Sequence, residues 1–221
     1  MSAPLSADEA DALKALEKKI YRSFFQDGLW DIFWGLILLS FAAQSAYSSL
    51  GLPYPLDHAI IPALAVLTLE LGKRYLTIPR LGKVRFGPQR RAQLQKGKTV
   101  LFILVTLALL ILILAIPALS LSQPNPDSEV IVRSLMMGLV ITAALGIIAF
   151  FQGFSRLYVY AIVFGLSLPV SQILKGKVAP PWEEWLAFGI PAVVMLAVGF
   201  VLLFRFLSTF KLKGEEDGHV K

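Results

Sequence analysis

Two acidic residues one helical turn apart stand at the start of the first long apolar segment of the chain. Asp27 and Asp31 are four positions apart, so in a helix they share one face. On their own they are too few for a metal-dependent phosphotransferase, and the positive end of a helix dipole already favours acids at this position. We expect Asp31, the deeper of the two, to reach into the bilayer and to need a cationic partner.

Basic residues that could supply this partner occur at two other points. Lys73 and Arg74 lie at the end of the second apolar segment, where they can also pair with Glu70 one turn before them, and Arg156 begins the fifth. We therefore predict a cluster of Asp31, Glu70, Arg74 and Arg156. This cluster would act as a structural clamp, or as a site for a ligand or lipid headgroup.

A basic loop, residues 76–98, separates the second and third apolar segments. Its Arg80, Lys83 and Arg85 could bind anionic lipid headgroups, because each cation near a charged membrane surface contributes about 1 kcal/mol. Pro79 and the glycines of this loop predict a small hairpin or ordered turn rather than a helix. The alternative is that these charges serve only to fix the orientation of the chain in the membrane.

These observations favour a non-enzymatic membrane module whose charged face binds lipid headgroups, anionic ones among them, or a partner protein. All of the candidate binding residues fall on the side of the membrane that carries most of the basic residues. They are Asp27, Asp31, Glu70, Arg74, Arg80, Lys83, Arg85 and Arg156.

No catalytic or metal-binding pattern accompanies these residues. The chain has no Cys, and its two His residues, His58 and His219, lie in an outer loop and in the tail. A Gly-x-Ser-x-Gly elbow and a phosphate-binding loop are both missing from the sequence. We therefore expect no catalytic residue, no metal and no cofactor. Nucleic acid is also excluded as a partner, because the basic residues lie in loops between apolar segments.

The apolar segments predict an all-α integral membrane protein. Hydrophobic residues make up 56% of the 221 positions and charged residues only 16%, whereas a soluble domain carries about 25% charged residues. Segment 99–119 contains no charge and, at about 1.5 Å per residue, is long enough to cross the roughly 30 Å hydrocarbon core. We predict about six transmembrane helices, over residues 29–49, 59–75, 99–119, 130–151, 157–174 and 182–206.

The distribution of Lys and Arg predicts the orientation of these spans. Of the 21 Lys and Arg residues, only Arg133, Lys175 and Lys177 fall in segments assigned to the outer side. Cytoplasmic segments are enriched in Lys and Arg. The sequence therefore predicts a multi-pass protein of the cell (inner) membrane with both termini in the cytoplasm.

The two ends of the chain complete the predicted organisation. Residues 1–28 are interpreted as a cytoplasmic amphipathic arm, in which a capping box from Ser6 to Glu9 starts a helix. We expect this helix to lie in the inner headgroup region, or else to dock a cytoplasmic partner. The transmembrane bundle spans residues 29–206, and residues 207–221 form a charged cytoplasmic tail.

Two motifs carry a resemblance to a known group of sequences. Residues 28–36 (GLWDIFWGL) and residues 79–86 (PRLGKVRF) resemble uncharacterised prokaryotic multi-pass membrane proteins. The resemblance covers the first two expected spans and the loop after them. It implies no mechanism, because no activity is established for that group.

A small transporter or channel for a neutral or weakly polar solute is the alternative function. Ion- and proton-coupled transporters place carboxylates or His inside the membrane, and the central turns of the six expected spans carry none. Gln44 and helix breaks at prolines such as Pro62 would then supply the contacts to a solute. Six spans could form two inverted repeats of three.

Small residues at every fourth position predict close helix packing. Gly138, Thr142 and Gly146 follow this spacing on the fourth expected span, and Ala161 and Gly165 follow it on the fifth. The short link between these spans makes them antiparallel neighbours. Their small-residue faces could meet within one molecule or join copies in a homo-oligomer, and the sequence leaves both arrangements open.

Overall fold

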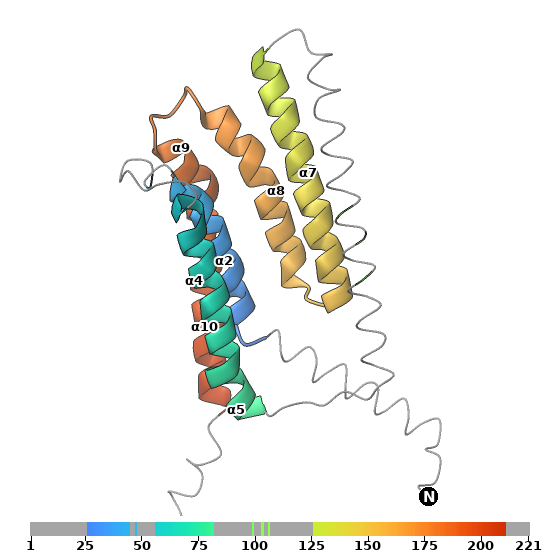
Figure 1. Ribbon diagram of the computed structural model, residues 1–221, viewed down its shortest axis with the longest axis vertical. Coiled ribbons are helices and arrows are strands. Elements are labelled where there is room, and N and C mark those ends of the chain that lie inside the picture. Colours follow the sequence, from blue (N-terminus) through green and yellow to red (C-terminus); the bar gives the residue numbers. More distant parts are fainter. Residues whose placement is uncertain are drawn as a thin grey trace, which may run out of the picture.

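A computed structural model describes residues 26–44, 47, 56–81, 99, 103, 106 and 126–210, and this part of the chain is all-helical (Figure 1). The first group of helices comprises α2 (Leu29–Ala42), α4 (Leu56–Gly72), the π-helical turn η1 (Lys73–Thr77) and α5 (Ile78–Leu81). The second group comprises α7 (Pro126–Gln152), α8 (Arg156–Leu174), α9 (Trp182–Glu184), the π-helical turn η2 (Trp185–Gly189) and α10 (Ile190–Thr209).

Within the described ranges, three helical segments are long and apolar enough to cross a membrane. They are Val130–Gln152, Arg156–Leu174 and Trp182–Thr209, of which the last runs through α9, η2 and α10. A helix needs about 20 apolar residues to span the hydrocarbon core. These segments coincide with the fourth, fifth and sixth expected spans.

The other expected spans correspond less closely to the structure. The helix α2 begins at Leu29 as expected but is a shorter apolar helix of 14 residues, which ends at Ala42. The helix α4 has 17 residues and continues into η1. The expected third span lies almost wholly outside the described residues, as do the amphipathic arm up to residue 25 and the tail from residue 211.

Each π-helical turn precedes a proline. The turn η1 ends two residues before Pro79, and η2 ends two residues before Pro191. Proline has no N–H, and its ring clashes with the carbonyl four residues earlier in a regular helix. In η1 the N–H of Ile78 bonds instead to the carbonyl of Lys73, five residues back. The extra residue in the turn accommodates the proline without ending the helix.

The prediction of an extended hairpin or turn is wrong for the first residues of the basic loop. Ile78–Leu81 forms the helix α5, which continues directly from η1. Pro79 lies inside this continuous helix, where the wider π-helical turn just before it relieves the clash that proline causes in a regular helix. Residues 82–98 of the loop lie outside the described part of the chain.

Small residues bring α7 and α8 into close contact. A Cβ built on Gly138 would lie 2.1 Å from the carbonyl oxygen of Gly165, so the two backbones touch. The Thr142 hydroxyl lies 2.9 Å from the Gly138 carbonyl and 3.1 Å from that of Ala161 on the other helix. These four residues meet within one molecule. Gly146 differs, because nothing lies within 4 Å of a Cβ built there.

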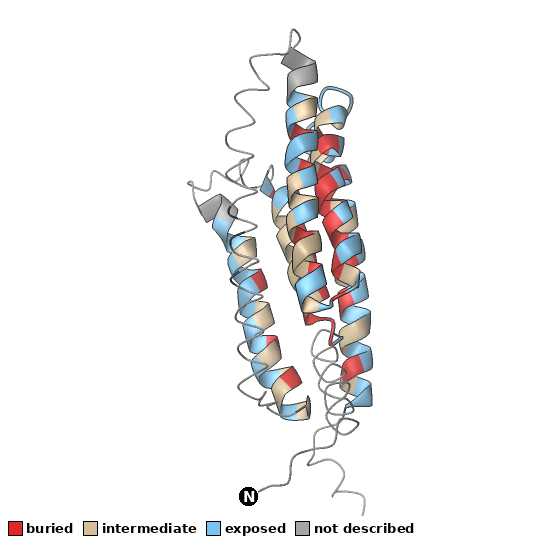
Figure 2. Ribbon diagram, turned by 90° about the vertical axis from the view of Figure 1, so that its right-hand side faces the viewer, coloured by how far each residue is buried: buried red, intermediate tan, exposed pale blue. Residues whose placement is uncertain are grey.

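The buried core is apolar and lies where α2, α7, α8, η2 and α10 face one another. Leu38, Phe164, Phe188 and Met195 are among its large members. Figure 2 shows the buried residues on the sides of the helices that face their neighbours, whereas outer faces are largely exposed. Large apolar side chains such as Phe204, 70% exposed, cover these outer faces, as expected where lipid replaces water.

Several helix ends gather at one end of the bundle. The start of α2, the end of α4 with η1 and α5, the α7–α8 turn and the C-terminal end of α10 all lie there (Figure 1). We call this the polar end, because the buried charged residues described below belong to it.

Candidate functional site

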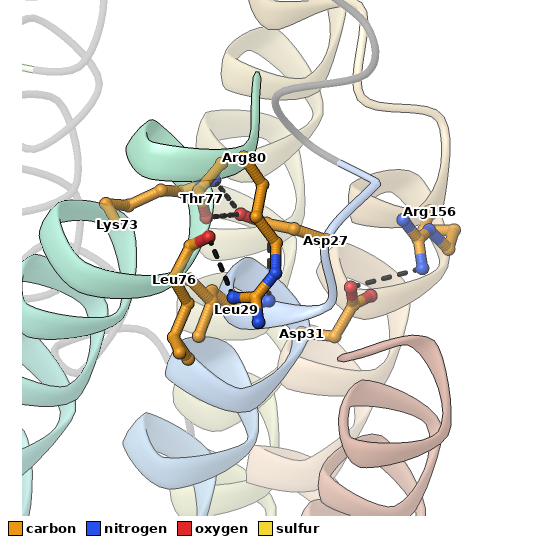
Figure 3. A network of polar contacts seen from close by, with 8 residues as sticks. All are labelled: Asp27, Leu29, Asp31, Lys73, Leu76, Thr77, Arg80 and Arg156. Carbon is orange, nitrogen blue, oxygen red and sulfur yellow. Dashed lines mark hydrogen bonds and ion pairs between the residues drawn. The ribbon is translucent and has the colours of Figure 1, made fainter. Parts of the chain in front are cut away.

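Two buried aspartates form the centre of a polar cluster at the polar end. Neither Asp27 nor Asp31 has any exposed surface. Burying a charged group is costly unless it is paired or hydrogen-bonded, so the contacts of these carboxylates determine what the site can do. Figure 3 shows most of the partners, which come from η1 and α8. The polar cluster consists of Asp27, Asp31, Lys73, Thr77, Arg156 and Tyr160.

Asp27 joins the start of α2 to η1. Its Oδ2 accepts hydrogen bonds from the Lys73 ammonium and the Thr77 hydroxyl, both at 2.6 Å. Its Oδ1 accepts from the backbone N–H of Leu29 at 3.3 Å, which satisfies one of the free donors at the start of α2. The Lys73 side chain is only 14% exposed, so this ion pair is screened from solvent (Figure 3).

Asp31 joins α2 to α8. Its Oδ1 accepts a hydrogen bond from the Tyr160 hydroxyl, and its Oδ2 forms an ion pair with the Arg156 guanidinium at 3.1 Å. The guanidinium also lies over the ring of Phe154, 5.3 Å from the ring centroid, where a cation–π contact adds to its stability. The first two turns of α8 thus provide both the charge and the hydroxyl that Asp31 binds.

Gly28 separates the two aspartates and turns the chain between them. Its φ of +79° lies in the left-handed region, which favours glycine. A Cβ at this position would lie 2.3 Å from the carbonyl oxygen of Gly199 on α10. The turn therefore requires both backbone freedom and the absence of a side chain, and it lets Asp27 bind η1 while Asp31 binds α8.

The polar cluster is electrically balanced. Two carboxylates face one ammonium and one guanidinium, and each carboxylate also accepts a hydroxyl hydrogen bond. In the described ranges, no group of three or more His, Asp or Glu side chains could hold a metal ion. This geometry makes the cluster a clamp between three helical elements, η1, α2 and α8.

The remaining candidates lie around the clamp rather than in it. Glu70 and Arg74 are exposed, and within the described residues no ion pair connects either of them to Asp31. The Arg74 guanidinium lies 5.8 Å from the centroid of the Tyr75 ring. Arg80 donates to the carbonyl of Leu76 at 3.3 Å. The candidates Lys83 and Arg85 lie outside the described residues.

Two members of the polar cluster, Thr77 and Tyr160, were not predicted from the sequence. Lys73 was predicted only as a possible partner of Asp31, whereas it pairs with Asp27. The sequence did contain a pattern that could have identified these hydroxyl residues. Thr77 follows Lys73 by four positions and Tyr160 follows Arg156 by four, so in a helix each hydroxyl shares a face with a cation.

Comparison with known proteins does not identify this site. No family model, no curated protein and no solved structure matches the chain. Function is therefore argued from the chemistry of the residues themselves.

Proposed function

We propose that the chain is a six-span protein of the inner cell membrane with both termini in the cytoplasm. The three long apolar helices support a membrane location, and the concentration of Lys and Arg on one side of the expected spans supports the orientation. In this orientation the polar end faces the cytoplasm. The segment before α2 forms an amphipathic helix in the headgroup region.

The natural absence of Cys makes this topology directly testable. Ser155→Cys places a thiol at the polar end, and Lys177→Cys places one at the opposite end of α8. A membrane-impermeant thiol reagent should label the Lys177→Cys protein in intact cells and the Ser155→Cys protein only after permeabilisation. The reverse pattern would overturn the orientation.

The proposed activity of the polar end is non-enzymatic binding of anionic lipid headgroups. The observation that supports it is the internal neutralisation of Asp27 and Asp31 by Lys73 and Arg156. Because the buried acids are already paired, they do not offset the other cations of this end. Arg74, Arg80, Arg205 and the basic loop therefore give the cytoplasmic surface a positive charge next to the membrane.

The structure favours this function over transport of a neutral solute. Buried hydroxyls that could line a polar pathway bond to their own helix instead: Ser167 to the carbonyl of Val163 and Ser171 to that of Leu168, both at 2.8 Å. Apart from the polar cluster, the remaining buried polar side chain among the described residues is Ser134, which bonds to the Ile131 carbonyl at 2.8 Å. A transporter would need polar groups turned toward a central cavity.

Native mass spectrometry of the protein, extracted in mild detergent with its bound lipids, tests the proposed binding. We expect retained anionic phospholipid in the native protein and less of it in the double variant Arg80→Ala, Arg85→Ala. A stoichiometric protein partner in place of lipid would instead identify a docking module. Equal lipid retention by the native protein and the variant would refute a role for the basic loop.

A further inference from the structure

A cleft of about 700 Å³ opens at the polar end beside the polar cluster. One wall is the α7–α8 turn, including Phe154 and Arg156, and the other is the C-terminal part of α10, including Leu202 and Arg205. Its volume falls within the range of small-molecule sites. None of the described residues that line it is acidic.

Arg205 gives this cleft its net positive charge. Arg156 also lines the cleft but is neutralised by Asp31, at 3.1 Å. Arg205 is exposed, and among the described residues no ion pair involves it. Gln26 adds an amide that can donate hydrogen bonds to an anion, whereas the Thr209 hydroxyl already donates to the Arg205 carbonyl at 2.8 Å.

The cleft continues into an apolar surface. Within the cleft, the apolar side chains beside Arg205 are Leu202, Phe206 and Phe210. Val198 lies one turn before Leu202 on the same stripe of α10 and is 40% exposed on the outer surface. A ligand that fits both parts carries an anionic group at one end and a hydrocarbon chain at the other.

From this arrangement we propose that the cleft binds the phosphate of one anionic phospholipid, with Arg205 as the principal cation and an acyl chain along α10. Basic pockets between transmembrane helices at the cytoplasmic surface suit phosphate-bearing headgroups in this way. The proposal rests on the cytoplasmic orientation and lipid binding proposed above. It goes further by assigning a discrete site on α10, formed by residues that do not belong to the basic loop.

Titration with a defined anionic phospholipid, followed by native mass spectrometry of the full-length protein, tests this site. Arg205→Gln should weaken binding of the first lipid roughly tenfold, because a charge-assisted hydrogen bond to phosphate is lost. Arg205→Lys should retain most of the affinity, because it keeps the charge. Arg133→Gln, which removes the same charge from the opposite end of the bundle, should bind like the native protein.

Two further results separate the possible explanations. If the Arg205→Gln variant binds the anionic phospholipid as well as the Arg133→Gln variant does, the site on α10 is refuted. The proposed function itself is refuted only if the native protein shows no selective binding of any anionic lipid. If Arg205→Gln weakens binding and the Arg80→Ala, Arg85→Ala variant does not, the α10 site stands without the loop. Competition by glycerol phosphate as strong as that by the phospholipid would show a soluble phosphate ligand and overturn the lipid assignment.

Discussion

Asp31 on α2 and Arg156 at the start of α8 form an ion pair with an N–O distance of 3.1 Å. The two residues are 125 positions apart in the sequence. Tyr160, one turn after Arg156, binds the other oxygen of the same carboxylate. Asp27 has the same kind of partners, since Lys73 and Thr77 also stand four positions apart. Each aspartate is therefore held by a cation and a hydroxyl from one helical face, and the two sites together connect η1, α2 and α8.

The ion pair between Asp31 and Arg156 should be strongly coupled in a double-mutant cycle. Arg156→Gln should lower the free energy of unfolding by about 3 kcal/mol, because it leaves the fully buried Asp31 carboxylate without its cation. Asp31→Asn should cost less, because the guanidinium that it leaves is 29% exposed. The double variant should lose less than the sum of the two. Unfolding measured in mild detergent checks this, and additive losses would mean that the pair does not stabilise the bundle.

Removing the charge of Asp27 should be more damaging than removing an exposed one. Asp27→Asn leaves the Lys73 ammonium, 14% exposed, without its carboxylate and should cost about 3 kcal/mol of unfolding free energy. Glu70→Gln is the matched control, because Glu70 is exposed on α4, and its effect should stay within about 0.5 kcal/mol. Equal effects would argue against a buried clamp at η1.

Gly28 should not tolerate alanine. The substitution combines a φ of +79° with a Cβ only 2.3 Å from the Gly199 carbonyl oxygen, and we expect a loss of about 3 kcal/mol. Gly176→Ala isolates the backbone contribution, because Gly176 has a φ of +77° and nothing within 4 Å of its Cβ position. That control should lose about 1 kcal/mol. Similar losses for the two variants would contradict the close approach of α2 to α10.

The contact between α7 and α8 can be tested with two glycines of one helix. Gly138→Ala should lower the unfolding free energy by about 2 kcal/mol, because its Cβ would meet the Gly165 carbonyl at 2.1 Å. Gly146→Ala should leave it unchanged or raise it by up to about 1 kcal/mol, because alanine favours the helix and finds open space. The opposite order would place the helix contact at Gly146.

Parts of this arrangement could be predicted from the sequence because they depend on local composition. The apolar segments that contain α7, α8 and α10 are readable from hydropathy, and the count of Lys and Arg assigns Asp31 and Arg156 to the same face of the membrane. Continuation of the helix to Leu81 was missed, because the π-helical turn η1 accommodates Pro79 in a way that residue propensities do not reveal.

The pairing within the polar cluster was less accessible to sequence reasoning. Asp27 binds Lys73 and Thr77 because α2 and η1 meet with particular rotations about their axes, which depend on tertiary contacts. One such contact is the Leu29 side chain against Gly72, where a Cβ would lie 2.6 Å from Leu29 Cδ2. Hydropathy and charge counts specify how deep a residue lies in the membrane but not how its helix is rotated about its axis. From the sequence alone, Glu70 and Arg74 were therefore as good candidates for the polar cluster as the residues that form it.

The central claim, that the polar end binds anionic lipid, is tested most directly by tryptophan quenching in reconstituted bilayers. Trp30 and Trp34 lie in the first two turns of α2, and replacing Trp182 and Trp185 with Phe leaves only these two as reporters. We expect a brominated anionic phospholipid to quench them more strongly than a brominated zwitterionic one at the same mole fraction, with the difference reduced by salt. Equal quenching by both lipids would contradict the claim.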